Sequence, residues 1–282
     1  MACVLQRCIL EPPCERARKG SLMLSTAAYG VLTVCAVVLV AIVGLGTVGR
    51  AVPTALRREH NDVAGFIYAV VGVVYAVLLA LVVIAVWEEH EAAKATAESE
   101  ANELAEVFWL AHRLPDPEGP RLQELARSYA REVVEEEWPL MERRRSSPRA
   151  WALLDDMRLG VQELEVRTPA DGVLFEQGLD RVRGLADARR TRLVEAEEGI
   201  PAVLWAVLVF GGIVTVGFTY LFGLENTWSH RLMVAAVAGV IALALFTVGS
   251  LEYPFSGGTR IGPDAFELVR GRFETSSLGN PR

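Results

Sequence analysis

The sequence predicts an all-α, polytopic membrane protein with four transmembrane helices and a helical-bundle insert between helices two and three. Four apolar stretches without Asp, Glu, Lys, Arg or His predict the spans, at residues 22–48, 63–87, 200–223 and 232–251. Each is long enough for the roughly 20 residues that a helix needs to cross about 30 Å of hydrocarbon. Because lipid leaves backbone groups without water, such stretches cross it as helices.

Residues 1–21 form the predicted flexible N-terminal leader. Its Arg16, Arg18 and Lys19 resemble the charged start of a signal peptide, but the apolar stretch that follows far exceeds a core of 7–15 residues. We therefore expect an uncleaved first span, with Met23 as an alternative start of translation. Residues 22–87 contain transmembrane helices 1 and 2, joined by a hinge at 49–62.

The second span continues into water as one helix. No helix breaker separates it from residues 88–114, where the strong helix formers Ala, Glu and Leu dominate. The run Pro115–Pro120 then ends this helix.

Residues 88–199 are predicted to be a soluble helical bundle. Apolar residues recur at helical spacing over about 122–138, 149–167 and 173–198, and no segment alternates as a strand would. Pro139 is expected to interrupt the first of these helices.

Transmembrane helices 3 and 4 occupy residues 200–251. In the final segment, 252–282, a turn at 254–258 precedes a short amphipathic helix at 263–273 and a disordered tail. That helix is expected either to lie on the membrane surface or to dock against the bundle.

An even number of spans places the bundle and both termini on one side of the membrane. That side carries more Lys and Arg within about 20 residues of the span ends than the opposite loops do. The count favours a multi-pass protein of the cell membrane with the bundle and both termini in the cytoplasm.

The second span carries a stripe of small and hydroxyl-bearing side chains. At 100° per residue, Asn61 and the small or hydroxyl-bearing residues that follow it lie within about 80° of one another. An unpaired phenol in hydrocarbon costs several kcal/mol, so the stripe must face protein or water. With the neighbouring Phe66, the candidate pore or helix-packing face is Asn61, Gly65, Phe66, Tyr68, Gly72 and Tyr75. Close packing through a small-xxx-small pattern and several copies lining a conduction path both fit the stripe.

Acidic residues flank two membrane exits on the bundle side. They form either a candidate acidic mouth, which would favour cations or bind a divalent ion, or a solvated helix surface. The residues are Glu88, Glu89, Glu91, Glu195, Glu197 and Glu198.

Several classes of function are disfavoured. The four histidines are scattered and form no HExxH or other catalytic pattern, so we expect no enzyme, catalytic residue or cofactor. Cys3, Cys8 and Cys14 lack a nearby histidine, and no metal site is expected. The net charge of −7 offers no electrostatic case for nucleic-acid binding. No span holds the ionisable residue typical of proton-coupled transporters.

Four patches resemble the bacterial bestrophin-like domain family, over about residues 24–273. They are His60–Phe66 (HNDVAGF), Val133–Pro139 (VVEEEWP), Gly217–Gly223 (GFTYLFG) and Pro254–Gly257 (PFSG). Asn61 with Gly65 and Phe66 is similar to the Asn-Pro-Pro-Gly-Phe segment of bestrophins, without its two prolines.

The resemblance implies a remote relationship to bestrophins, which are pentameric ion channels with four spans per subunit. In those proteins a cytosolic helical body follows the second span, and successive aromatic side chains of that span form the neck of the pore. Phe66, Tyr68 and Tyr75 are the aromatic residues available here.

Two hypotheses of different classes follow. The first is an oligomeric ion channel, a pentamer if bestrophin-like, with helix two lining the pore. The second is a membrane-anchored scaffold or sensor whose helical bundle binds a partner, without conduction. The expected partners are membrane lipid and further copies of the chain.

Overall fold

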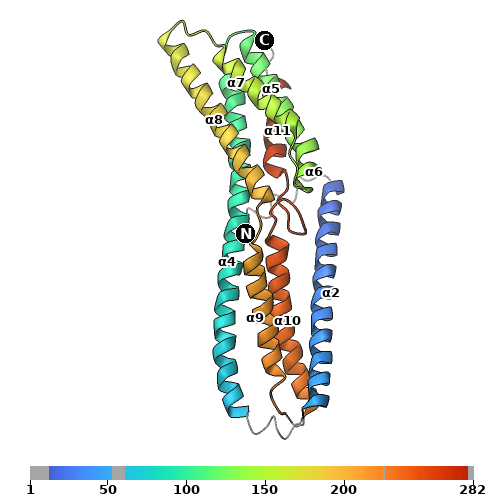
Figure 1. Ribbon diagram of the computed structural model, residues 1–282. Helices are drawn as coiled ribbons and strands as arrows, with labels where there is room; N and C mark the ends of the chain where they lie inside the picture. Colours follow the sequence, from blue (N-terminus) through green and yellow to red (C-terminus); the bar gives the residue numbers. More distant parts are fainter. Residues whose placement is uncertain (1–12, 53–60, 225, 279–282) are drawn as a thin grey trace, which may run out of the picture. The chain divides into compact units, whose positions relative to one another are not determined.

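The computed structural model describes residues 13–52, 61–224 and 226–278, and the chain divides into two units (Figure 1). The first unit contains the chain up to Trp87 and Ile200–Glu252, and the second contains Glu88–Gly199 and the residues from Tyr253 onward. Helix α4 (Asn61–Ala111) belongs to both units. The described residues contain helices and no strand, as predicted for an all-α membrane protein.

Among the residues that the structure describes, four helices are long and apolar enough to cross a membrane. They are α2 (Pro13–Ala51), the first part of α4, α9 (Ala202–Thr219) and α10 (Thr227–Leu251). Helix α2 begins within the predicted leader, whose residues 1–12 lie outside the described part of the chain, as do residues 53–60 of the predicted hinge.

Helix α10 begins before its apolar stretch because Asn226 caps it. The Asn226 side chain accepts hydrogen bonds from the backbone N–H groups of Trp228 and Ser229. The first turn therefore includes His230, whose Nε2 lies 2.9 Å from the carbonyl oxygen of Thr219 at the end of α9. This polar cap joins α9 and α10 at the end of the helix pair.

Small residues allow the spanning helices to approach closely, which is the usual basis of packing in lipid. Helix α10 packs against α2 and α9. A Cβ atom on Gly30 of α2 would stand 2.8 Å from the Phe246 ring of α10. A Cβ atom on Gly44 would stand 2.9 Å from the Tyr220 hydroxyl. Neither glycine can be enlarged without moving its neighbour.

Most of the spanning surface is not covered by the chain itself. In the most apolar window of each span, 11% of the residues of α2 and α4 and 22% of those of α9 and α10 are buried. The remaining apolar side chains are therefore available to lipid or to further subunits.

The second unit is a helical bundle around one hydrophobic core. Residues 88–111 of α4 join α5 (Glu118–Glu132), α7 (Pro148–Gln162) and α8 (Pro169–Glu197). Ser147 caps α7, and Thr168 with Asp171 forms a capping box at the start of α8. Leu104, Phe108, Tyr129, Leu154 and Leu185 are among its completely buried side chains.

The chain remains helical through the expected interruption at Pro139. A π-helical turn, η1 (Val133–Glu137), follows α5, and α6 (Trp138–Met141) continues from it. Proline has no N–H to donate to the preceding turn, and a widened turn directly before Pro139 accommodates that loss. Glu137, the last residue of the π turn, is completely buried.

The predicted amphipathic helix docks against the bundle. Helix α11 (Asp264–Leu278) packs on α5 and η1, and its Phe266, Val269 and Phe273 are buried. Phe273 stacks on Phe108 of α4 with ring centroids 4.0 Å apart. The helix continues into the predicted disordered tail, of which 279–282 lie outside the described residues.

Candidate functional site

The candidate site begins with Tyr75, near the middle of the second span. Its hydroxyl donates a hydrogen bond to the carbonyl oxygen of Leu208 on α9, at 3.1 Å, and its side chain is buried. A Cβ atom on Gly211 would stand 2.6 Å from the Tyr75 ring, and one on Gly212 would stand 3.1 Å from the hydroxyl. The two glycines therefore make room for the phenol, and the phenol is satisfied within the same chain.

Asn61 and Tyr68 face the same side as Tyr75. The Asn61 amide nitrogen donates to the carbonyl oxygen of Gly223 at 3.2 Å, and its oxygen accepts from the Gly223 N–H at 2.9 Å. Tyr68 meets Phe222 edge to face, with ring centroids 5.7 Å apart. These contacts attach α4 to α9 and to the segment that follows it.

The small residues of the stripe contribute unequally. A Cβ atom on Gly65 would lie 3.8 Å from Phe222, which is ordinary contact, whereas one on Gly72 would meet nothing within 4 Å. Within one chain, the polar members of the stripe thus form a helix-packing face.

Phe66 lies on the opposite side of α4 from the rest of the stripe. It is 74% exposed, and at 100° per residue it shares a face about 60° wide with four exposed aliphatic residues. We call this the outer face of α4, and it consists of Phe66, Val70, Val73, Val77 and Ile84. It is apolar throughout and has no partner of its own within the described chain.

The predicted acidic residues are only partly brought together. Glu195 of α8 accepts a hydrogen bond from the Thr96 hydroxyl of α4 at 3.1 Å, while its second carboxylate oxygen is buried without a partner. Burial raises the pKa of Glu195, and the nearby carboxylates of Glu89 and Glu198 raise it further. These three residues form an acidic cluster.

The other acidic candidates stand apart from this cluster. Glu88, Glu91 and Glu197 are exposed, and among the described residues no hydrogen bond or ion pair holds them. No group of three or more His, Cys, Asp or Glu side chains in the described part of the chain is arranged to hold a metal ion.

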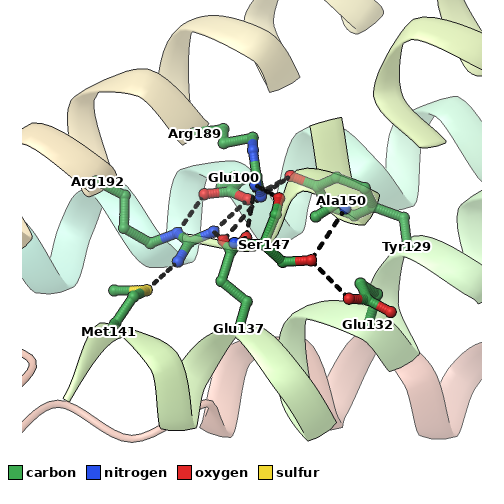
Figure 2. A network of polar contacts seen from close by, with 9 residues as sticks. All are labelled: Glu100, Tyr129, Glu132, Glu137, Met141, Ser147, Ala150, Arg189 and Arg192. Atoms are coloured by element: carbon green, nitrogen blue, oxygen red, sulfur yellow. Dashed lines mark hydrogen bonds and ion pairs between the residues drawn. The ribbon is translucent and has the colours of Figure 1, made fainter. Parts of the chain in front are cut away.

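A buried network of charges, not predicted from the sequence, lies inside the bundle (Figure 2). The Arg192 guanidinium of α8 donates from Nε to Glu100 Oε2 at 2.5 Å and from Nη2 to Glu137 Oε1 at 2.7 Å. The Arg189 guanidinium donates to both oxygens of Glu137, at 2.8 and 2.5 Å. All four charged side chains are completely buried, and their charges balance.

Neutral groups complete this network. The Tyr129 hydroxyl donates to Glu100 Oε1 at 2.7 Å, and the Ser147 N–H donates to Glu137 Oε2 at 3.1 Å. Arg189 also donates to the carbonyl oxygen of Ser147 at 3.2 Å, whereas its Nε has no partner. The network ties α4, α5, η1 and α8 to one another in a fixed register.

The pKa shifts in the network follow from burial and charge. Burial alone would raise the pKa of Glu137, but Arg192 and Arg189 outweigh it and hold the pKa below its ordinary value. Burial and the Glu100 carboxylate raise the pKa of Tyr129 well above its ordinary value. Glu137 is therefore ionised and Tyr129 neutral at physiological pH.

Comparison by sequence and comparison by fold both match this chain to bestrophin-like proteins. A family model described as the Bestrophin-like domain matches residues 35–266. A crystal structure of a bacterial bestrophin homolog from Klebsiella pneumoniae is 12% identical and has a TM-score of 0.64, with 89% of this chain and 99% of that chain covered. A point-mutated form of the homolog is 11% identical, has a TM-score of 0.65 and covers 87% and 99%. No curated protein matches the sequence.

Proposed function

We propose that this chain, which belongs to the bestrophin-like family, assembles into a homo-oligomeric ion channel whose pore is lined by the outer face of α4. The family match and the four-span fold support a channel-like membrane protein. A pentamer is the assembly that the relationship to bestrophins suggests.

The observation that carries the proposal is the division of α4 into two faces. Asn61, Tyr68 and Tyr75 meet α9 and the segment after it, and the hydrogen-bonding groups of Asn61 and Tyr75 have their partners within one subunit. The outer face, with Phe66 at one end and Ile84 at the other, stays exposed. In a ring of subunits, such an apolar face could contact either lipid or the central pore. The relationship to bestrophins favours the pore.

An apolar pore lining has a definite physical role. A narrow constriction lined by Val and Phe side chains excludes water and so blocks ions until it widens. In this proposal the contact between α4 and α9 acts as the support that holds the outer face in place. Ions would pass when that support moves.

The membrane orientation belongs to the same proposal. The excess of Lys and Arg supports a cytoplasmic bundle in a protein of the cell membrane. The acidic cluster of Glu89, Glu195 and Glu198 would then lie in the cytoplasm, where it would attract cations.

A pair of valine substitutions tests the proposal. Val73 on the outer face and Val240 on α10 are 64% and 68% exposed, and each becomes serine in its own variant. Reconstituted in planar bilayers, the wild type is expected to conduct. Val73→Ser should increase the current by hydrating the constriction, while Val240→Ser should leave it unchanged.

The same preparation gives the subunit number by native mass spectrometry in a mild detergent. Several copies per particle are expected. Absence of current in several salts, together with a monomer, would contradict the proposal and leave the alternative of a membrane-anchored scaffold or sensor.

A further inference from the structure

A cluster of arginines occupies the loop between α6 and α7. Arg143, Arg144 and Arg145 are consecutive and exposed, and Arg149 follows in the first turns of α7. No ion pair within the described residues holds the side chains of Arg143 and Arg145. Elsewhere in the bundle, exposed arginines commonly pair with an acid, as Arg183 does with Asp180. The loop therefore carries positive charge that the bundle does not neutralise.

Arg144 fixes this loop against Tyr253. The Arg144 guanidinium carbon lies 3.9 Å from the centre of the Tyr253 ring, a short cation–π contact. Its backbone adopts a φ of 56°, the left-handed region that a residue other than glycine rarely occupies. Beside it, Glu142 forms an ion pair with Arg260. The loop is thus held by specific contacts.

Tyr253 lies next to two membrane exits along the chain. It follows Leu251, the last residue of α10, by two residues, which is at most about 7 Å of extended chain. A Cβ atom on Gly199 would stand 2.7 Å from its ring, and Gly199 comes shortly before Ala202, where α9 begins. Through its contact with Tyr253, the arginine loop is therefore linked to both membrane exits by only a few residues of chain.

The local charges favour an anionic partner. Because Glu142 is already paired with Arg260, it does not neutralise Arg143 or Arg145. The exposed Glu197 and Glu198 precede Gly199, and no ion pair joins them to the loop. Arginine binds phosphate through two parallel N–H groups, and basic residues beside a span are attracted to anionic lipid.

From these observations we propose that Arg143 and Arg145 bind the phosphate of anionic lipid headgroups where α9 and α10 leave the membrane. This binding is separate from conduction, since it requires neither a pore nor an oligomer. Each arginine near an anionic surface should strengthen lipid binding about fivefold, so the pair should contribute roughly 25-fold.

The test uses the full-length protein, purified in a neutral detergent, and native mass spectrometry of bound lipid. Phosphatidylglycerol should be retained in preference to phosphatidylcholine, and the preference should weaken as salt rises. The double variant Arg143→Gln with Arg145→Gln should lose most of it. The control, Arg158→Gln with Arg183→Gln, removes two arginines that pair with acids on their own helices, and it should keep the preference.

Three outcomes would overturn the proposal. Equal retention of the two lipids would show that the protein does not distinguish lipids by the charge of the headgroup. Undiminished preference in the Arg143/Arg145 double variant would place the site elsewhere. Full displacement of the lipid by an equal concentration of inorganic phosphate would show a site for free anions in place of lipid.

Discussion

Replacing Glu137 with glutamine should destabilise the bundle far more than the same change two residues away. Glu137 accepts hydrogen bonds from Arg189, Arg192 and the Ser147 N–H, and it is completely buried. The neutral amide would leave two buried guanidinium groups with Glu100 as their only carboxylate. Removing one partner of a buried ion pair typically costs about 3–5 kcal/mol.

This cost is measurable as a melting temperature. For a chain of this size, each kcal/mol lowers Tm by about 2–4 °C, so Glu137→Gln should lower it by roughly 6–20 °C. The control is Glu135→Gln, in the same run of acids. Glu135 is half exposed and contacts Arg270 at 3.2 Å, a surface pair worth about 0–1 kcal/mol. Circular dichroism of the detergent-solubilised protein follows both melts.

The dependence on pH has a definite sign. Because the folded state lowers the pKa of Glu137, its contribution is fully present above the unfolded pKa of about 4.3. The contribution is lost as pH falls through the lowered folded value. The difference in Tm between wild type and Glu137→Gln should therefore stay constant from pH 5 to 8 and shrink only in stronger acid. Equal Tm values for wild type and Glu137→Gln at pH 7 would refute the reasoning.

The remaining predictions concern the span contact and the acidic cluster. Tyr75→Phe removes one interhelical hydrogen bond and should cost about 0.5–1.5 kcal/mol, read from the thermal melt. Gly211→Ala forces a methyl into the Tyr75 ring and should cost about 1–3 kcal/mol, so a larger loss in Tyr75→Phe would contradict the packing described. Glu195→Gln should raise Tm at pH 7 and converge with wild type near pH 4. The reason is that a raised folded pKa penalises the ionised carboxylate increasingly as pH rises above about 4.3. Glu197→Gln, at an exposed position, should leave Tm unchanged at both pH values, and an equal rise there would refute the role of burial.

The helices were predictable from two features of the sequence. The length of an apolar stretch indicates a helix surrounded by lipid, and the helical spacing of apolar residues indicates a helix with one face in water. The continuous α4 followed from the absence of a helix breaker between 63 and 114, and the structure confirms it. The start of α10 was missed because the cap at Asn226, and not the apolar stretch, determines where that helix begins. The π turn before Pro139 was missed because hydrophobic period does not reveal a single extra residue in a turn.

The stripe on α4 illustrates what a helical wheel leaves open. In the structure Asn61, Tyr68 and Tyr75 contact α9 and the segment after it, but a helical wheel does not say which neighbour a face meets. Phe66 belongs to the other side of α4, as its own angle on the wheel indicates. Partner identity depends on how helices far apart in the sequence pack together.

The sequence does contain an indication of the buried network, but hydrophobic period alone does not reveal it. The indication is the charged residues at inward positions of helices. Glu100 lies between the buried residues Ala97 and Leu104 on the inward face of α4. Arg189 and Arg192 follow Leu185 along the chain and lie on the inward face of α8. Opposite charges at inward positions of two helices expected to pack predict a buried pair. The fourth charged member, Glu137, could be placed at an inward position only once the π turn was known.

The most direct test of the account is the accessibility of the outer face of α4 to a charged thiol reagent during current recording. The background replaces all four cysteines with serine, including the exposed Cys35 of α2. In that background, the reagent is added to the aqueous solution on each side of the bilayer in turn. It should change the current through Val73→Cys and leave the current through Val240→Cys unchanged. Equal effects at both positions, or none at Val73→Cys in a conducting protein, would contradict a pore lined by this face.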